Sequence, residues 1–565
     1  MLSIRKIGVI GRTYRHLNRY RQILRVLFKY GFGDLVDILK IEQYLEIGLQ
    51  MISRKRREKI EKLTRAERVR LSLEELGPTF IKLGQILSTR PDLIPLEYIK
   101  ELSKLQDQVP PFPYEDVRET LKSETGKFPE ELFERFDETP LAAASIGQVH
   151  RATLKDGEEV AVKIQRPGIR KTIEVDLEIM LHLAGLMERH LEELEAHRPS
   201  RIVDEFARSL EKEINYSAEA SHIERFARQF MDDETVYIPK VFRQMSTKRI
   251  LTMEYVDGIK ASEVDRLRKE GYDLPEITRR GADLIMKQIF DHGFFHADPH
   301  PGNILVLPNN VIGLVDFGMV GRISRQEREA FTDLVTQVVR GDEKKVVDAV
   351  LNLTYYEKDP DRSEFERDLA EFIDQHLYCS LKELEIGKLL QQLLEILTKY
   401  RLRLKPDLFL MMKALSTVEG LGLMLDPDFE LIKRAEPFIR QIQLRRFNPK
   451  TIAGDMIDTG AELFTLLKEI PREVRTILKQ AREGKVKIEF EHKGLEPMLF
   501  THDRTSNRIA FAIVLAALII GSSLIILSDI PPKWNDIPII GLAGFIFAGV
   551  MGFWLLVSIL RRGRM

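Results

Sequence analysis

The stretch that most restricts the fold of this 565-residue chain is a pair of short motifs in its middle third. The motifs are His296-Ala297-Asp298-Pro299-His300-Pro301-Gly302-Asn303 and Asp316-Phe317-Gly318. Between them, the apolar runs 304–307 and 311–315 stand on either side of Pro308-Asn309-Asn310. Short apolar runs separated by turn-forming residues predict two buried strands in a hairpin. Such a hairpin would bring the polar side chains of both motifs into one cleft.

The acid and amide side chains of these motifs have the spacing of a kinase catalytic loop and its magnesium-binding turn. In such a site, Asp298 lies beside the attacking hydroxyl or water and acts as a base or orients the water. Asn303 and Asp316 hold Mg²⁺ against the nucleotide phosphates. An isolated Asp-Phe-Gly is common by chance, but the whole set in this order is specific. We therefore favour a catalytic site over an ordinary polar loop.

A nucleotide-binding roof is predicted upstream, where the sequence changes to short alternating strands. It begins with a loop of small residues that consists of Leu141, Ala142, Ala143, Ala144, Ser145, Ile146, Gly147, Gln148 and Val149. Asp156-Gly157 is a hairpin-turn dipeptide, and the strand 160–164 follows it. Lys163 in this strand is the cation expected to reach the α and β phosphates. Alanines stand where glycines are usual and restrict the backbone, so we expect a stiff loop over the phosphates.

The acid that orients Lys163 is expected within the strongly helical region 171–231. Glu219, Glu174 and Glu178 are all candidates. Helical periodicity does not choose between them, because most acids in this region are expected to lie on a solvated helix face.

The sequence on either side of the two motifs completes the outline of a kinase-like fold. Residues 250–258 predict a strand that leaves into a linker, where the backbone of a kinase hinge holds adenine. A helix over 274–292 leads to the catalytic loop. Ser324 and Glu327 then form a capping box that begins a bundle of helices over 324–440. No Ala-Pro-Glu and no extended activation loop follow, which argues against ordinary phosphorylation of a peptide.

The first 30 residues are basic and contain no acid, and Leu17, Leu24 and Leu27 recur among them at helical spacing. Two interpretations remain open. The segment is either an amphipathic helix on an anionic membrane surface or a helix whose apolar stripe packs on the domain.

A further helix is predicted from Pro78 to the stop at Pro91. Gly84 inside this helix costs about 1 kcal/mol relative to Ala, which indicates close packing at that point. The sequence alone favours Lys82 and Gln85 as ordinary solvated side chains.

Two uncharged apolar runs near the C-terminus, 509–527 and 537–560, are each close to the ~20 residues that cross a bilayer. They predict a transmembrane hairpin in preference to a buried hairpin of a soluble protein. Arginines before the first run and after the second indicate that both ends are cytoplasmic. Gly544, Ala548 and Gly552 form a stripe of small residues. Packing between the two helices, packing between two copies and a plain lipid-facing mixture are all open interpretations of this stripe.

Composition adds two constraints. Hydrophobic residues at 44% suffice for a sizeable core, and the net charge of −1 gives no reason to expect nucleic acid as a partner. The single cysteine, Cys379, excludes an intramolecular disulfide and fits a reducing compartment. We expect it to be a small apolar filler rather than a reactive thiol.

The chain resembles the UbiB family of atypical kinase-like proteins, the AarF-domain group, over nearly its whole length. The resemblance is carried by Lys82-Leu83-Gly84-Gln85, the loop from Ala142 to Val149, Glu213-Ile214-Asn215 and the two central motifs. It implies a kinase fold with a helical N-terminal extension. It also implies ATP hydrolysis, rather than phosphorylation of proteins, in support of ubiquinone biosynthesis or isoprenoid-lipid handling.

The resemblance implies a regulatory role for one group of residues. Lys82 and Gln85 would project into the cleft where a peptide acceptor would otherwise lie, which reverses the expectation that they are merely solvated. Glu213 would pair with the helix that carries Lys82 and Gly84.

The resemblance also selects Glu219 as the acid bonded to Lys163. The chain departs from the family at Asn215, where an acid is usual, so we expect any charge contact of this residue to be weakened.

We therefore predict an α+β chain with a two-lobed protein-kinase-like fold, a helical N-terminal extension and a C-terminal transmembrane helical hairpin. The predicted segments are a basic helical region at 1–70, the helical extension at 71–113, an N-lobe at 114–258, a C-lobe at 259–445, a helical linker at 446–506 and two transmembrane helices at 507–565.

The predicted function is that of a membrane-anchored kinase-like ATPase that binds Mg²⁺ with ATP or ADP. The expected partners are the bilayer, an isoprenoid or quinone-precursor lipid, proteins of a biosynthetic complex and a second copy of the chain. The expected location is the cytoplasmic (inner) membrane, multi-pass, with the kinase-like domain on the cytoplasmic side. A genuine protein or small-molecule kinase and a non-catalytic, nucleotide-gated lipid-binding scaffold are the alternatives.

Overall fold

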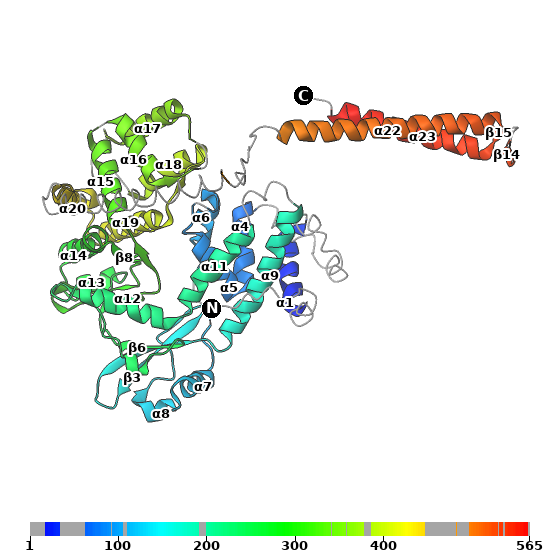
Figure 1. The fold of residues 1–565 in the computed structure, drawn as a ribbon. Coiled ribbons are helices and arrows are strands. Elements are labelled where there is room, and N and C mark those ends of the chain that lie inside the picture. Colours follow the sequence, from blue (N-terminus) through cyan, green and yellow to red (C-terminus); the bar gives the residue numbers. More distant parts are fainter. Residues whose placement is uncertain are drawn as a thin grey trace. The chain divides into compact units, whose positions relative to one another are not determined.

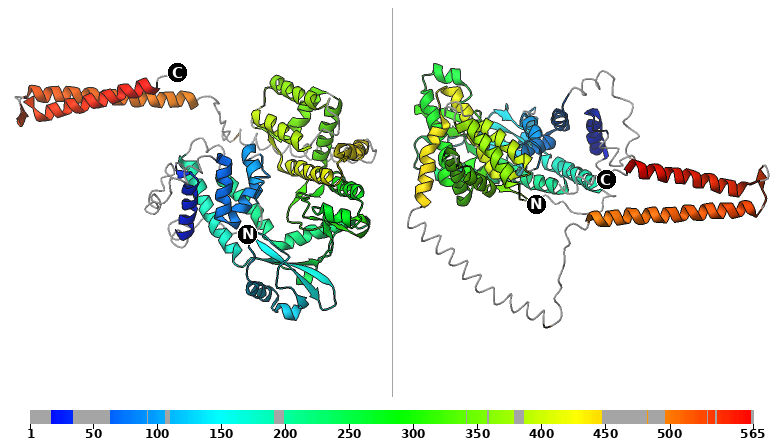
Figure 2. Two further views of the ribbon diagram at one scale, coloured as in Figure 1. Left: turned by 180° about the vertical axis from the view of Figure 1, so that it is seen from behind. Right: turned by 90° about the horizontal axis from the view of Figure 1, so that it is seen from above.

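The computed structural model describes most of the chain. The described residues are 17–33, 63–91, 93–105, 110–190, 199–340, 342–356, 359–377, 386–446, 482, 496–528, 530–534 and 537–562. The chain divides into two compact units, 1–453 and 454–565 (Figures 1 and 2). Cys379 and most of the predicted linker 446–506 lie outside the described residues.

A five-stranded antiparallel sheet forms the N-lobe. Its strands are β1 (Phe133–Phe136), β2 (Ala142–Ala143), β3 (Gly147–Leu154), β4 (Glu159–Gln165) and β6 (Ile250–Glu254). The order is β1-β3-β4-β6, and β2 pairs with β3. The turn from β3 to β4 contains Gly157 at a φ of +88°, which confirms the predicted Asp156-Gly157 hairpin. The predicted strand at 250–258 is confirmed over its first part.

The two faces of this sheet have different roles because successive side chains of a strand point to opposite sides. Val160, Val162 and Ile164 of β4 pack in a core with the helix α7 (Tyr114–Thr125). Lys163, between the last two, lies on the opposite face, toward α12 (Tyr216–Gln229). The alternation of β4 thus separates its structural side chains from its one functional cation.

Helices from the N-terminal part share a core with this second face. They are α1 (Leu17–Lys29), α4 (Arg65–Leu76), α5 (Pro78–Leu87), α6 (Leu96–Leu102), α9 (Ile169–His190) and α11 (Pro199–Glu213). Figure 1 shows them grouped beside the sheet. α5 begins at Pro78 as predicted and ends at Leu87, before the predicted stop. A Cβ at Gly84 would lie 2.2 Å from Cδ1 of Leu105 and 2.9 Å from Cδ1 of Leu73, so the close packing predicted there is confirmed.

α1 resolves the two interpretations of the basic N-terminal segment for the part that the structure describes. Tyr20, Ile23 and Leu24 are buried in the shared core. Arg19 donates to Asp176 of α9 over 2.7 Å and 3.0 Å. The apolar stripe is therefore covered by protein and not free for a membrane surface. Residues 1–16 lie outside the described residues.

The C-lobe begins with α13 (Val264–Lys269) and α14 (Leu274–Met286), which continues as a π-helical segment to His292. Short strands then carry the central motifs. They are β8 (Phe294–His296), β9 (Ile304–Leu307), β10 (Val311–Leu314) and β11 (Val320–Arg322). β9 and β10 form the predicted antiparallel hairpin, and β8 pairs with β11. β5 (Val236–Tyr237) and β7 (Ile259–Lys260) flank the hairpin.

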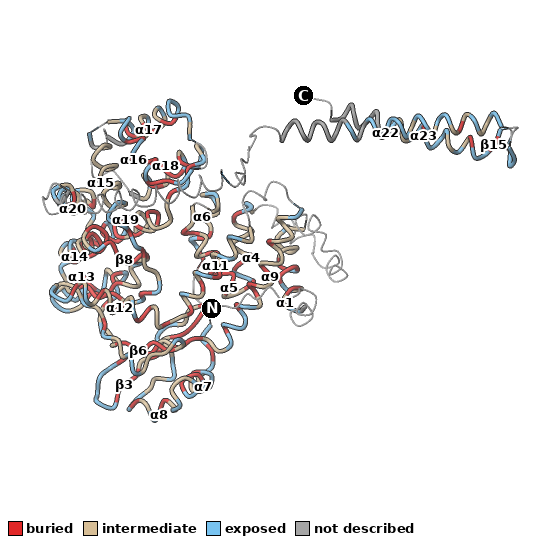
Figure 3. The backbone as a smooth tube through the Cα atoms, viewed as in Figure 1, coloured by how far each residue is buried: buried red, intermediate tan, exposed pale blue. Residues whose placement is uncertain are grey.

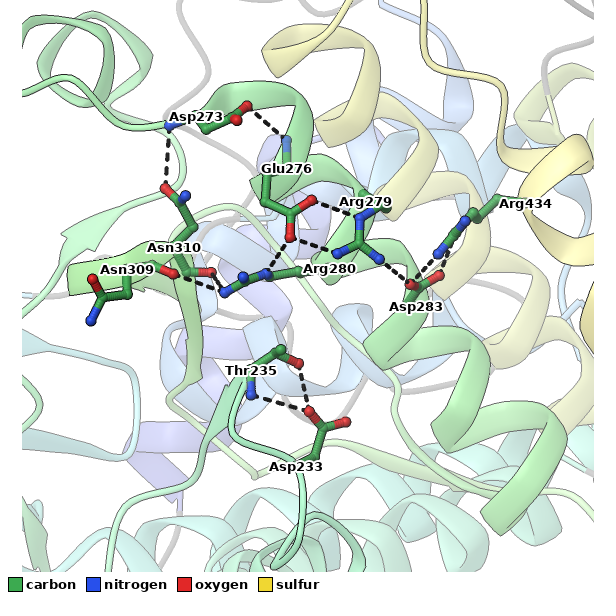
Figure 4. Close-up of polar contacts among 10 residues, drawn as sticks. All are labelled: Asp233, Thr235, Asp273, Glu276, Arg279, Arg280, Asp283, Asn309, Asn310 and Arg434. Carbon is green, nitrogen blue, oxygen red and sulfur yellow. Dashed lines mark hydrogen bonds and ion pairs between the residues drawn. The ribbon is translucent and has the colours of Figure 1, made fainter.

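A polar network holds the turn of the β9–β10 hairpin (Figure 4). Asn309 and Asn310 adopt positive φ angles of 63° and 58°, which asparagine tolerates better than most residues. Arg280 of α14 donates to both of their carbonyl oxygens over 2.8 Å and 2.9 Å. On the same helix, Asp283 accepts from Arg434 of α20 (Leu431–Arg446). The hairpin that separates the two central motifs is thus fastened to the helical core.

A bundle of helices completes the first unit. Its members are α15 (Arg325–Arg340), α16 (Glu343–Asn352), α17 (Arg362–Leu377), α18 (Ile386–Lys399), α19 (Pro406–Leu425) and α20 (Leu431–Arg446). The predicted capping box is confirmed, because the amide of Ser324 donates to Glu327 over 3.0 Å and the Ser324 hydroxyl accepts from the amide of Glu327 over 3.2 Å. β12 (Thr354–Tyr355) and β13 (Arg403–Leu404) pair within the bundle.

The second unit contains a helical hairpin of α22 (Glu496–Leu527) and α23 (Ile539–Arg562), joined by the short strands β14 (Lys533–Trp534) and β15 (Ile537–Pro538). A Cβ at Gly544 would lie 2.2 Å from Oγ of Ser522, and Ala548 is 2% exposed. The stripe of small residues therefore lies at the contact between the two helices of one chain.

Two helices of the described chain are long and apolar enough to span a bilayer, within Pro406–Leu425 and Ile509–Leu527. The first is 56% buried, as a core helix of the C-lobe. The second is only 6% buried, and the described side chains of its partner helix are mostly exposed as well (Figure 3). The hairpin thus has a large apolar surface that its own unit does not cover.

Candidate active site

Lys163 of β4 and Glu219 of α12 form a buried ion pair. The ammonium of Lys163 donates to both carboxylate oxygens, over 2.8 Å and 2.9 Å. The two side chains are 15% and 6% exposed. Glu219 is therefore the partner of Lys163, as the family resemblance implied, and the other candidates, Glu174 and Glu178, are not.

Asp316 is the third member of this charged group. Its backbone has a φ of +64°, and one carboxylate oxygen, Oδ1, accepts from the amide of Gly318 over 3.2 Å. Lys163 lies 3.5 Å from the same oxygen and holds the pKa of Asp316 at about 2. Burial alone would lower the pKa of Lys163, but Asp316 and Glu219 raise it well above its usual range. Both side chains are therefore charged at neutral pH.

His296 connects the two central motifs, a role that the sequence analysis did not assign. Its Nδ1 accepts from the amide of Asp298 over 3.2 Å, so Nε2 carries the proton and donates to the carbonyl of Asp316 over 2.7 Å. The ring is 1% exposed, and burial lowers its pKa. A neutral imidazole thus sets the relative position of the two acids.

Asn303 is bound to the same loop. Its Nδ2 donates to the carbonyl of Asp298 over 3.3 Å, and its own carbonyl accepts from the amide of Val315 over 3.0 Å. The side-chain amide oxygen of Asn303 is the atom that would hold a cation. The backbone segments that carry Asp298, Asn303 and Asp316 are thus held together through a few short contacts.

The donor set suits Mg²⁺ with a nucleotide. Mg²⁺ is usually held by one or two carboxylates together with substrate phosphates, and it keeps several waters. Asp316 and the amide oxygen of Asn303 supply ligands of that kind. Among the residues that the structure describes, no cluster of three His, Cys, Asp or Glu side chains would hold a metal without such phosphates.

The roof loop is a tight hairpin. Ala142 and Ala143 pair with Val149 and Gln148, and the amide of Ala144 donates to the carbonyl of Gly147 over 2.8 Å. The loop predicted over Leu141–Val149 is therefore reduced to a short turn. This short turn agrees with the expected stiffness.

The side chain of Gln148 is buried within the N-lobe. It exchanges hydrogen bonds with the backbone of Phe112, over 3.0 Å and 3.3 Å, and contacts His150 at 2.9 Å. The side chain of Gln148 therefore supports the roof from inside, and the predicted role of this residue in the phosphate loop stays a prediction about its backbone. The segment 110–113, at the end of the predicted helical extension, is packed on the sheet through Phe112.

Gly147 is required for a packing reason. A Cβ there would lie 2.3 Å from the hydroxyl of Tyr216 and 2.6 Å from the carbonyl oxygen of Ile164. The Tyr216 hydroxyl and Oγ of Ser145 are buried, and neither has a hydrogen-bond partner among the described residues. Burial raises the pKa of Tyr216 well above its usual range, so the hydroxyl stays protonated. Two unpartnered hydroxyls beside the roof fit a ligand rich in acceptor oxygens.

A second ion pair joins the N-terminal extension to the same region. Nζ of Lys82 lies 2.6 Å from Oε1 of Glu213 at the end of α11, and the two side chains are 11% and 24% exposed. The sequence-based expectation of a solvated Lys82 is thus wrong, and the pairing implied by the resemblance is confirmed. Gln85 donates to the carbonyl of Leu105 over 3.3 Å. Lys82 and Gln85 both fasten α5 rather than point into bulk water.

Comparison with known proteins agrees with this geometry. Residues 104–350 match the ABC1 atypical kinase-like domain, residues 369–430 the UbiB helical domain and residues 493–561 the ABC1/UbiB kinase-like C-terminal domain. A probable protein kinase UbiB from Shewanella piezotolerans is 30% identical over 94% of this chain and 96% of its own length. The chain belongs to the ABC1/UbiB kinase-like family.

Other relatives extend the match. A protein from Clostridium pasteurianum, described as an uncharacterized protein in the hydrogenase 1 5′ region, is 34% identical over 96% of this chain and 99% of its own. Among solved structures, the Rv3197–erythromycin complex from Mycobacterium tuberculosis has a TM-score of 0.44 and 26% identity, and it covers 61% of this chain and 87% of its own.

The departure of this UbiB-family chain at Asn215 has a local explanation. Oδ1 of Asn215 accepts from the amide of Ser217 over 3.2 Å and caps the N-terminus of α12. Asn and Asp are equally good N-caps. The substitution therefore preserves the cap that places Glu219 in the first turn of the helix.

Sequence reasoning missed three residues at this UbiB-family site. His296 stood in a recognised motif without a role, and Tyr216 directly follows the Glu213-Ile214-Asn215 stretch. The third, Lys413 of α19, is separated from the motifs along the chain and gave no local signal. Its ammonium lies 3.9 Å from Oδ1 of Asp298.

Proposed function

We propose that this chain binds Mg²⁺ with ATP or ADP and hydrolyses ATP in support of ubiquinone or isoprenoid-lipid biosynthesis. The observation that carries the proposal is the buried ion pair of Lys163 and Glu219, beside the more exposed carboxylate of Asp316. Burying two charges is costly unless they are paired or serve a ligand. In this group Lys163 would hold the α and β phosphates, and Glu219 would orient it.

The remaining roles follow from the catalytic loop. Asp316 and Asn303 would hold Mg²⁺, which when bound would supply positive charge to the phosphates. Asp298 would orient the attacking water and accept its proton. Hydrolysis fits better than transfer to a peptide, because only a few residues separate Gly318 from the start of α15 at Arg325. A chain that short provides no platform for a peptide acceptor.

Membrane anchoring is part of the proposal. The exposed apolar surface of α22 and α23 favours a bilayer, and the flanking arginines favour a topology with both ends in the cytoplasm. The bilayer of the cytoplasmic membrane and an isoprenoid or quinone-precursor lipid are the proposed partners, with the lipid class taken from the family resemblance. A biosynthetic complex and a second copy of the chain are further proposed partners.

The metal assignment is tested by Asp316→Asn in the full-length, detergent-solubilised protein. Mg²⁺ with ATP should raise the melting temperature of the wild type and leave that of the variant unchanged. Asp368→Asn is a matched control, because Asp368 is an aspartate bound to Lys399 outside the kinase-like domain match. An equal shift in Asp316→Asn and in the control would contradict the assignment.

The reaction is tested by phosphate release with and without liposomes and with a panel of polyprenyl phenols. Release that Asp298→Ala abolishes supports hydrolysis. Transfer of radiolabel to a lysate protein, lost in the same variant, would instead support a kinase. Binding of the phenols without any turnover would support the scaffold.

A further inference from the structure

Lys413 approaches the catalytic loop from a helix outside the kinase-like domain match. It lies on α19 within the UbiB helical domain match, and its ammonium is 3.9 Å from Oδ1 of Asp298. Its neighbours Met411 and Ala414 are fully buried, so the helix has little freedom to turn. Asp407, near the start of α19, accepts from the amide of Arg322 in β11 over 3.2 Å. The helix is thus fixed against the strand that follows Asp316-Phe317-Gly318.

The catalytic loop itself lacks a permanent positive charge. Residues 296–303 contain no lysine and no arginine. Lys163 is engaged by Glu219 and Asp316, on the side of the site where the α and β phosphates are expected. Transfer of the terminal phosphoryl group needs positive charge at its oxygens, because these oxygens carry the charge of the transition state. Lys413 is a cation that lies beside Asp298, the predicted base.

The contact between Lys413 and Asp298 leaves the ammonium available. At 3.9 Å the two groups form an ion pair but not a hydrogen bond. Their side chains are 32% and 42% exposed. Moving the flexible lysine head from Asp298 to a phosphate oxygen would therefore break no hydrogen bond between the two and would exchange one anionic partner for another.

We propose that Lys413 contacts the γ-phosphate of ATP beside Asp298 and so brings the helical domain into the active site. The assignment rests on the proposed function, in which ATP is the bound nucleotide. In hydrolysis, the water oxygen bonds to the γ-phosphorus while the bond to the bridging oxygen of ADP breaks, and Asp298 receives the proton. Lys413 stays protonated throughout and neutralises the phosphoryl oxygens.

The contact predicts a selective loss of affinity. Lys413→Met should weaken binding of a non-hydrolysable ATP analogue by roughly 10- to 100-fold, the usual effect of losing a hydrogen bond to a charged group. Binding of ADP, which lacks the γ-phosphate, should be unchanged. Lys413→Arg should recover most of the affinity. Lys399→Met is the matched control, because it removes a lysine of α18 that pairs with Asp368, and it should alter neither affinity.

Repeating the measurement in the Asp298→Asn background distinguishes a γ-phosphate contact from a purely structural role of the Lys413–Asp298 pair. If Lys413 only balances the charge of Asp298, its removal will have no further effect once that charge is gone. A γ-phosphate contact instead keeps the selective loss in the double variant Asp298→Asn/Lys413→Met.

Titration of the purified full-length protein in Mg²⁺ with the analogue and with ADP provides the readout. A selective loss in both backgrounds supports the assignment. An unchanged ratio of the two affinities in Lys413→Met overturns it, and the proposed function survives if the wild type binds and hydrolyses ATP. A wild type that binds neither nucleotide overturns both.

Discussion

Two lysine–glutamate pairs meet at the junction of α11 and α12, and they differ in what surrounds them. Glu213 ends α11 and binds Lys82 of the N-terminal extension, whereas Glu219 begins α12 and binds Lys163 of the sheet. Lys163 has a second anion, Asp316, within 3.5 Å. Glu213, the acid of the Lys82 pair, is more accessible to water than Glu219, the acid of the Lys163 pair.

This difference assigns different tasks to the two pairs. A buried pair with an extra acid has negative charge in excess, which suits a site that receives a cation with its phosphates. A balanced pair between two helices fastens them together. We infer that the Lys163 pair serves the ligand and that the Lys82 pair holds the extension in place.

The largest effect is expected from Lys163→Met. It leaves Glu219 buried without its partner and should lower the free energy of unfolding by about 3 kcal/mol. It should also abolish stabilisation by Mg²⁺ with ATP. Chemical denaturation with and without nucleotide measures both effects. The double variant Lys163→Met/Glu219→Gln should regain part of the stability but no nucleotide response, and a single variant as stable as the double one would contradict the burial argument.

Gly84→Ala tests the packing beneath the Lys82 pair without removing a charge. The new methyl group meets side chains of Leu105 and Leu73 at less than 3 Å, so we expect a loss of about 2 kcal/mol. Gly281→Ala in α14 is the matched control, because no atom lies within 4 Å of the added carbon. It should stabilise the protein by about 0.5 kcal/mol or slightly more. Equal effects of the two changes would refute the packing account.

Lys82→Met should have a smaller effect than either, a loss of roughly 1 kcal/mol, because Glu213 can still reach water. The rise in melting temperature with Mg²⁺ and ATP should persist. Thermal unfolding with and without nucleotide measures both. If that rise disappears as it does in Lys163→Met, the two pairs do not divide the tasks as inferred.

The smallest effect is expected at His296. This residue is connected to the Lys163 pair because its ring donates to the carbonyl of Asp316, which in turn contacts Lys163. Its pKa is lowered from 6.5 by burial, so as pH falls below 6.5 the unfolded chain takes up a proton that the folded chain does not. Its contribution to stability is complete above pH 6.5 and is lost on acidification. When the pH falls from 7.5 to 6, the free energy of unfolding should decrease less in His296→Gln than in the wild type, by roughly half a kcal/mol. Parallel denaturation series at both pH values measure this, and identical losses would contradict it.

Local patterns predicted the elements that bear the site. The β9–β10 hairpin, the Asp156-Gly157 turn and the Ser324–Glu327 capping box depend on neighbours in the chain, and each forms where expected. The assignment of Asp298, Asn303 and Asp316 to the predicted site likewise rested on their spacing along the chain. Their neighbour His296 escaped notice because its role depends on a carbonyl in the second motif.

Other expectations required knowledge of distant neighbours. Periodicity left three acids open as partners of Lys163; the family resemblance selected Glu219, and the packing of α12 on the sheet provides the physical reason. Composition favoured a solvated Lys82, which the structure buries against Glu213. Gln148 belonged to the predicted phosphate loop, and its side chain turns inward to Phe112.

The sequence by itself determined the motif order, the turns, the strand alternation that isolates Lys163 and the membership of the family. Tertiary structure alone decided that the apolar α19 is a core helix while α22 stays uncovered, and that Lys413 reaches Asp298. The reason is physical: turn and strand preferences act over a few residues, whereas burial and ion pairing depend on which distant surfaces the chain brings into contact.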